Sequence, residues 1–396
     1  MRGVAIILIL ALLAAFCGGC WSRREITEIA IVLGMGLDLT PDGRVGLSLQ
    51  IARPGAFYGG GDTAGGEGRV ACWVVRGEGE TLEEAAAYLA GKVPRELYWG
   101  HSVVLIFGEE MARRGVGAVA DFFGRKREPR ETMWVTVAEG RASDVLECHS
   151  VLEKTSAQAA AFLVTMGLGT AVRFREFVES LADEGVEPIA TRVTVREVGV
   201  TPCPGEAGAV GPHRQAETSG TAVFRGDKLV GWLDQAETRG LLWLKGRAVG
   251  QVLTVRVPGK PEGWLSFRAR RQRAEIVPRL EGGSVRFDVN LVAEFDMVEQ
   301  GGIGDFAGPD QIRGSERLLA GAMEAEAGAV VERVRSAYGS DIFGFGDAFH
   351  RKYKREWHEM KGRWDEEFAR AEVRINARAF VRETGLLTIR AETGRE

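Results

Sequence analysis

The sequence has few of the residues that usually carry crosslinks, metal sites or catalysis. It contains only five Cys and five His among 396 residues. Three of the cysteines, Cys72, Cys148 and Cys203, lie beyond the first twenty residues, and they are scattered and odd in number. This pattern predicts neither a disulfide framework nor a zinc site, because both need characteristic spacings. We therefore expect these thiols to be inert.

Motifs for catalysis are also missing. The sequence has no His-Glu-x-x-His zinc motif and no Gly-x-Ser-x-Gly nucleophile elbow. His350 and His358 are eight residues apart on an expected helix, which is too far for one metal ion. Glu109 and Glu110 follow an expected strand, where they suit the start of a helix. We expect no catalytic residues, no metal, no cofactor and no enzymatic activity.

The chain has no excess of positive charge. Its formal net charge is −4, and its densest basic cluster, residues 268–273, has the pattern of a solvated strand face. Nonspecific nucleic-acid binding depends on neutralising many phosphates with Lys and Arg. Nucleic acid is therefore not an expected partner.

Only one apolar run stands out, and it lies at the start of the sequence. Arg2 precedes the apolar residues 4–16, a length typical of a signal peptide and too short to span a bilayer as a helix. Gly18 and Gly19 then precede Cys20, in a pattern that resembles a lipobox, although Cys17 stands where Leu is usual. We expect residues 1–19 to be a signal peptide and Cys20 to be lipidated. The alternative is an ordinary signal peptide cut near Gly19.

Lipidation at Cys20 would decide where the chain works. One acyl chain gives marginal membrane binding, and each buried methylene adds about 0.8 kcal/mol, so two or three chains hold a protein almost permanently. No later segment approaches 18 continuous apolar residues. We expect membrane lipid as a partner through Cys20, with the remaining chain on the extracytoplasmic side.

Expected elements divide the remainder into two parts. Residues 20–200 predict a mixed α/β domain of one or two subdomains, with strands near 26–39, 45–51, 70–75, 102–107, 133–138 and 191–200 and a helical region over 142–181. The range 201–218 is rich in Pro and Gly and predicts a linker. Residues 219–390 predict an α+β domain with an antiparallel sheet and two long helices. The expected fold class is multi-domain α+β, with largely antiparallel sheets flanked by helices.

Two aromatic features allow alternative interpretations. Five aromatic side chains share one face of the last expected helix, which favours a core position over a partner groove. The loop Ser340–Gly346 carries Phe343 and Phe345 between two helices. Its phenylalanines either plug the core, the more common arrangement, or contact a partner.

Several segments together resemble the Ger(x)C family, the C-subunit lipoproteins of spore germinant receptors. Residues 20–38 resemble the opening of the mature family chain, with Ser22 where Asp is usual. Further matching blocks are YWGH before SVVLIFGEEMAR, GTAVF with DKLVGWL and ETRGLLW, SDIFGFG, and the terminal Thr384-Gly-Leu386. The resemblance covers nearly the whole chain.

The resemblance implies a subunit without catalytic activity. It implies a mixed α/β protein on the outer face of the inner spore membrane, acting in spore germination beside two integral membrane subunits, A and B, of a nutrient germinant receptor. We expect docking to those subunits. The candidate partner contacts are Trp21, Arg23, Arg24 and Glu25 near the anchor, and Phe343 and Phe345 in the loop.

Two other functions would need features that the sequence does not favour. A solute-binding lipoprotein that delivers a nutrient to a transporter would need two similar α/β lobes, whereas long alternating strands follow residue 248. A tethered hydrolase would need converging catalytic groups. Binding of one nutrient by the isolated protein would favour the solute-binding alternative.

Overall fold

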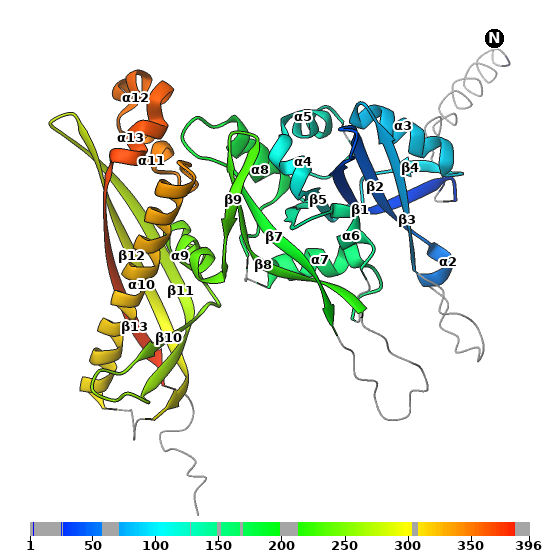
Figure 1. The fold of residues 1–396 in the computed structure, drawn as a ribbon. Coiled ribbons are helices and arrows are strands. Elements are labelled where there is room, and N and C mark those ends of the chain that lie inside the picture. The colour runs from blue at the N-terminus through cyan, green and yellow to red at the C-terminus, as the bar shows by residue number, and fades with distance from the viewer. Residues whose placement is uncertain are drawn as a thin grey trace, which may run out of the picture.

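The computed structural model describes most of the chain after the predicted leader. The described residues are 3, 25, 27–57, 71–126, 128–148, 152–166, 169–198, 213–302 and 308–384. They form helices and two mixed sheets, which confirms the α+β class. The two sheets lie side by side, with the nine-stranded sheet on the right of Figure 1 and the four-stranded sheet on the left.

The nine-stranded sheet has parallel strands at its centre. Its order is β3-β2-β1-β5-β6-β7-β8-β9, and the short β4 also pairs with β1. β1 is parallel to β4 and β5, and β5, β6 and β7 are parallel to one another, whereas the other neighbours are antiparallel. The strands are β1 Ile29–Leu39, β2 Val45–Ala52, β3 Cys72–Gly79, β4 Glu96–Tyr98, β5 Val104–Gly108, β6 Trp134–Ala138, β7 Ile189–Val198, β8 His213–Arg225 and β9 Lys228–Leu233.

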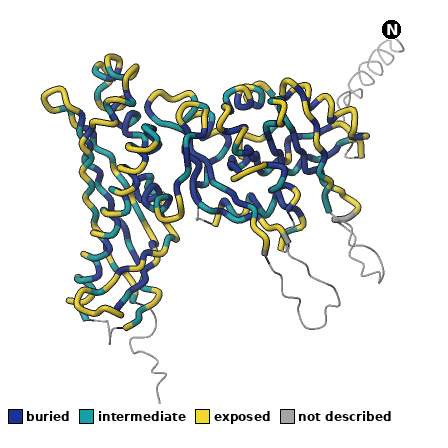
Figure 2. The backbone as a smooth tube through the Cα atoms, in the orientation of Figure 1, coloured by how far each residue is buried: buried dark blue, intermediate teal, exposed yellow. Residues whose placement is uncertain are grey.

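Helices cover this sheet, and local sequence fixes several of their ends. Thr81 caps α3 by accepting a hydrogen bond from the main-chain N–H of Glu84 at 3.2 Å, as its residue type suggests. β5, at the centre of the sheet, is buried along its whole length. Figure 2 shows the buried backbone running through the middle of this domain. The helices are α2 Pro54–Phe57, α3 Leu82–Lys92, α4 Glu109–Arg114, α5 Gly117–Arg125, α6 Ala142–Leu146, α7 Ser156–Thr165 and α8 Phe174–Ala182.

The helical region expected over 142–181 consists of three separate helices, α6, α7 and α8. Thr155 is extended and caps α7, so α7 starts anew. Before α8, the chain runs beside β6: the N–H of Val135 donates to the Val172 carbonyl, and the N–H of Phe174 donates to the Met133 carbonyl. This pairing holds Val172 and Arg173 out of a helical conformation, and α8 begins at Phe174.

The range expected to form a linker contains the start of a strand. β8 begins at His213, and it pairs with β7 along ten register positions from Ile189↔Val223 to Val198↔His213. Residues 213–218 therefore belong to the nine-stranded sheet, and the expectation of a linker is wrong for them. β8 and β9 likewise extend this sheet beyond residue 219.

The four-stranded sheet has the order β10-β11-β12-β13 and packs against a long helix. The expected antiparallel arrangement holds for β10 with β11 and β11 with β12, but β13 is parallel to β12. The reason is the helical crossover between β12 and β13, which brings the chain back to the same end of the sheet. The elements are α9 Gln235–Lys245, β10 Val252–Arg256, β11 Trp264–Glu281, β12 Ser284–Gly301, α10 Pro309–Ala337, α11 Phe345–Lys352, α12 Lys354–Met360, η1 Lys361–Arg363, α13 Trp364–Arg370 and β13 Glu372–Glu383.

Only one of the two expected long helices is continuous. After α10, the second helix is divided, and the first break falls at Tyr353, whose φ and ψ of −119° and 62° are not helical. The five aromatic side chains that share one face of this expected helix nevertheless form part of the core. Phe349, Trp357, Trp364 and Phe368 are buried, and Tyr353 packs against them, as the core interpretation predicts.

α9 links the two sheets. Asp234 and Glu237 form a capping box: Asp234 Oδ1 accepts from the Glu237 N–H at 2.8 Å, and Glu237 Oε2 accepts from the Asp234 N–H at 2.9 Å. Gly246 ends the helix in the left-handed conformation, at a φ of 71°. α9 packs against β8 of one sheet and against α10 and β11 of the other.

Candidate functional site

A polar cavity of about 520 Å³ opens where β1 and β5 end. Asp38 lies near the end of β1, Glu109 and Glu110 follow β5, and Gly140 and Arg141 follow β6. The carboxyl ends of neighbouring parallel strands meet at one edge of a sheet, the usual place for a ligand in open α/β folds. This strand-end cavity is therefore a candidate site.

Asp38 holds one wall of the strand-end cavity in place. Its buried carboxylate accepts hydrogen bonds from the N–H of Ala142 at 2.7 Å and from the N–H of Ser143 at 2.9 Å. These are two of the unpaired N–H groups at the start of α6. Asp38 therefore acts as a structural carboxylate, since both of its oxygens are already engaged.

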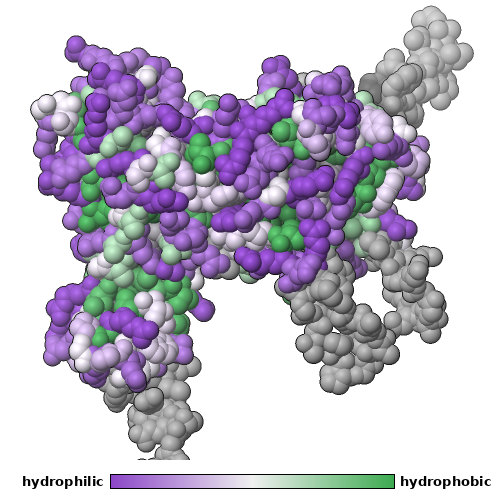
Figure 3. All heavy atoms as spheres, viewed as in Figure 1, coloured by the Kyte–Doolittle hydropathy of each residue, from purple (hydrophilic) through white to green (hydrophobic). Residues whose placement is uncertain are grey.

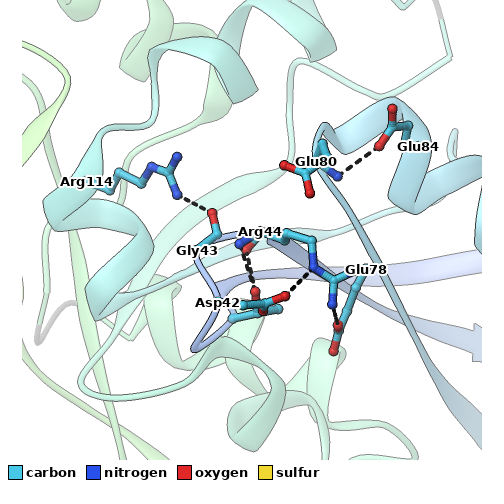
Figure 4. Close-up of polar contacts among 8 residues, drawn as sticks. Asp42, Gly43, Arg44, Glu78, Glu80, Glu84 and Arg114 are labelled. Carbon is cyan, nitrogen blue, oxygen red and sulfur yellow. Dashed lines mark hydrogen bonds and ion pairs between the residues drawn. The ribbon is translucent and has the colours of Figure 1, made fainter.

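The β1–β2 turn forms a second wall, shown in Figure 4. Arg44 donates to Asp42 at 2.5 Å and to Glu78 of β3 at 2.9 Å, and Arg114 donates to the Gly43 carbonyl. Hydrogen bonds from Thr40 and from Arg44 lower the pKa of Asp42. The turn is thus fastened to β3 and α4 by exposed charged groups.

Most charges around the strand-end cavity are paired with one another. Arg113 pairs with Glu109 at 2.8 Å, and Arg76 pairs with Glu147. Glu110 and Arg141 form no ion pair with other residues that the structure describes, but both are exposed. The cavity can hold a small polar molecule, although it offers no buried charged group that lacks a partner. Within the described ranges, no group of three or more His, Cys, Asp or Glu could hold a metal ion.

The residues predicted from the sequence as the lipidation site and the partner contacts do not line this cavity. Cys20, Trp21, Arg23 and Arg24 lie outside the described residues, whereas Glu25 is exposed ahead of β1. Phe343 and Phe345, predicted as partner contacts, are 3 % and 0 % exposed, so that prediction is wrong. Their rings pack on Phe368, at centroid distances of 6.3 and 5.9 Å, which fits the alternative in which they plug the core.

Sequence reasoning missed the strand-end cavity. Glu109 and Glu110 were assigned only to a helix start, which is correct, since both lie in the first turn of α4. The available signal was their position at the end of a buried strand, together with Asp38 at the end of another. Its recognition required knowing that β1 and β5 are parallel neighbours.

The described residues contain no helix long and apolar enough to cross a membrane. Hydrophilic residues cover most of the face shown in Figure 3, with apolar areas over the lower part of the four-stranded sheet domain.

Two family models match the chain. Residues 22–195 match the spore germination protein N-terminal domain, and residues 219–385 match the C-terminal domain described as spore germination B3/GerAC like. Similar proteins of Bacillus subtilis (strain 168) include spore germination protein KC, 26 % identical over 93 % of this chain and 92 % of that protein. Spore germination protein B3 is 22 % identical over 92 % and 93 %.

The fold also has a solved counterpart. The crystal structure of the GerBC protein superimposes with a TM-score of 0.56 at 20 % identity, covering 88 % of this chain and 96 % of that chain. At this identity the likeness concerns the fold. Because the two family models together match most of the sequence, the chain belongs to the GerAC-like family of spore germination proteins, the Ger(x)C family that its motifs resemble.

Proposed function

We propose that this chain is a lipid-anchored subunit of a nutrient germinant receptor, which docks to integral membrane subunits of that receptor on the outer face of the inner spore membrane. The observation that carries the proposal is the match of both family models in their order along the chain. The leader and Cys20 provide the anchor, and the chain's role is in assembly, without catalysis.

The anchor promotes docking by confinement. Cys20 lies only nine residues before β1 begins at Ile29, and an extended chain spans at most about 3.6 Å per residue. The folded body is then held within a few tens of Å of the bilayer. Confinement raises its effective concentration near membrane partners, so modest contacts suffice. Trp21, Arg23, Arg24 and Glu25 are the proposed contacts, because they lie in this short segment.

Replacement of Cys20 tests the anchor. We expect Cys20→Ala to move the protein from the membrane fraction to the soluble fraction of the spore and to slow germination. Cys72→Ala is the matched control, because Cys72 lies in β3 of the folded body. Retention of Cys20→Ala in the membrane, or an unmodified Cys20 thiol in the mature native protein, would refute the anchor.

Photo-crosslinking tests docking separately. A crosslinker at residue 21 or 25 should capture an A or B subunit in intact spores, whereas one at Glu383, exposed at the far end of β13, should not. Equal capture from all three positions would argue against docking near the anchor.

The solute-binding alternative is less well supported. It would need two similar α/β lobes, whereas the two sheets described above differ in strand number, order and helical cover. We therefore retain the receptor subunit as the proposal.

A further inference from the structure

A second cavity lies where the two sheet domains meet. It has a volume of about 290 Å³ and is lined by α8, by the segment between α8 and β7, and by the end of α9. Figure 1 shows α8 and α9 in this region, between the two sheets. We call this cavity the junction pocket, and it is separate from the strand-end cavity.

Hydrogen bonds across the domain boundary hold the walls of the junction pocket. The N–H of Glu187 donates to the Asp341 carbonyl at 2.9 Å, and the N–H of Asp347 donates to the Gly185 carbonyl at 2.9 Å. On the other side, Arg247 after α9 pairs with Glu176 of α8 at 3.3 Å. The pocket is therefore built by both domains and depends on how they meet.

Lys245 is the unusual residue of this pocket. It lies in the last turn of α9, is half-buried, and makes no hydrogen bond or ion pair with any residue in the described parts of the chain. The pKa of Lys245 is lowered to about 8, chiefly by burial and also by the charge of Arg247, while the charges of Asp341, Asp347 and Glu176 oppose this shift. A partly desolvated ammonium without a direct partner is costly, so it favours an anion beside it.

The acidic residues around Lys245 are already engaged elsewhere. Asp183 accepts from the N–H of Gly185 at 2.7 Å, and Glu187 accepts from the N–H of Gly226 at 2.6 Å. Glu176 pairs with Arg247, and Glu179 pairs with Arg175 at 2.7 Å. None of these four carboxylates forms an ion pair with Lys245. Together they give the pocket an acidic rim, which repels ligands of high negative charge.

We propose that the junction pocket binds a small molecule that carries a single carboxylate, which forms an ion pair with Lys245. The volume is at the lower end of the range for ligand pockets, so the ligand has few heavy atoms. The acidic rim selects against phosphate and other multiply charged anions. This inference goes beyond the receptor-subunit role, and it does not depend on the lipid anchor.

Binding in this pocket would couple the two domains. A ligand held between α8 and α9 touches both and stabilises the arrangement in which the pocket exists. The pocket thus provides a route by which a small molecule stabilises the packing of the two domains.

The test follows the Lys245 ammonium directly. The full chain in detergent is reductively methylated with ¹³C, and the lysine signals are followed by NMR during titration with sodium propionate, against sodium chloride of equal ionic strength. We expect a saturable shift of the Lys245 signal and a rise in its pKa on binding, because a nearby carboxylate favours the charged form. Potassium phosphate should bind at least tenfold more weakly.

Two variants complete the experiment. Lys245→Met should abolish saturable propionate binding, whereas Lys260→Met, at an exposed turn after β10, should bind as the wild type does. A Lys245 signal that propionate does not move in the wild-type protein would overturn the proposal, and so would phosphate binding of equal strength. The wild-type signal decides the outcome even if Lys245→Met fails to fold.

Discussion

The indole Nε1 of Trp364 donates a hydrogen bond to Asp341 Oδ2 at 3.0 Å, and the same carboxylate accepts from four consecutive main-chain N–H groups, those of residues 343–346. Asp341 is only 2 % exposed, and burial raises its pKa while these donors oppose the rise. One carboxylate thus organises the whole SDIFGFG loop, including the buried Phe343 and Phe345.

We expect Asp341→Asn to lower the free energy of unfolding by about 2–4 kcal/mol, because the amide nitrogen would face a donor that now has no acceptor. Urea denaturation followed by tryptophan fluorescence measures this loss. Asp365→Asn is the matched control. Asp365 is an exposed ion-pair partner of Arg225, so its replacement should cost less than about 1 kcal/mol. Equal effects of the two variants would contradict the role given to Asp341.

A pair of glycine substitutions tests the contact between α9 and α10. A Cβ at Gly240 would lie 2.5 Å from the Glu326 carbonyl oxygen, so the two helices would have to separate. We expect Gly240→Ala to destabilise the protein by about 1–3 kcal/mol. Gly321, on α10, has nothing within 4 Å of such a Cβ, and Gly321→Ala should stabilise by about 0.5–1 kcal/mol. Thermal unfolding measures both, and shifts of the same sign would contradict the close helix contact.

Some local structure follows directly from short sequence signals. Asp234 and Glu237 are three residues apart, so their capping box needs no information from the rest of the chain. The same is true of Thr81 at the start of α3. The aromatic stripe was correctly assigned to the core, although the break at Tyr353 was not foreseen.

Features that depend on distant partners were not predictable in this way. The parallel pairing of β13 with β12 follows from the path of the crossover helices. α10 then covers the free edge of β13, where Glu324 of α10 accepts a hydrogen bond from the N–H of Ala377 at 2.7 Å. The junction pocket likewise needs Glu187 and Asp341 to meet. A single sequence contains no local trace of either contact.

Cys148 should be a slow thiol. Burial raises its pKa to about 11, and its sulfur donates to the Asp144 carbonyl at 3.1 Å. Because the thiolate is the reactive form, alkylation near pH 8 should be about a hundredfold slower than for a thiol of ordinary pKa. Peptide mass spectrometry after timed iodoacetamide treatment measures this rate, with urea-unfolded protein as the control. Equal rates in folded and unfolded protein would show that Cys148 is accessible.

The pKa of Lys245 predicts a particular dependence of stability on pH. In the folded protein this pKa is about 8, below the ordinary value of 10.5, so between these values the unfolded chain binds more protons. The contribution of Lys245 to the free energy of unfolding must therefore rise as the pH increases from about 8 to 10.5, and it is lowest below pH 8. The charged groups that act on Lys245 are Asp341, Arg247, Asp347 and Glu176.

The comparison that isolates this effect is the difference in unfolding free energy between the wild type and Lys245→Met, measured in urea from about pH 7.5 to pH 10.5. The unfolding free energy of the wild type should rise relative to that of the variant as pH rises. Cys148 and the other titrating groups are present in both proteins, so their effects cancel in the difference. Lys260→Met, which removes an exposed lysine, should track the wild type at every pH. If the unfolding free energy of the wild type minus that of Lys245→Met stays constant or falls as pH rises, burial does not lower the pKa of Lys245, and the reason for an anion in the junction pocket disappears.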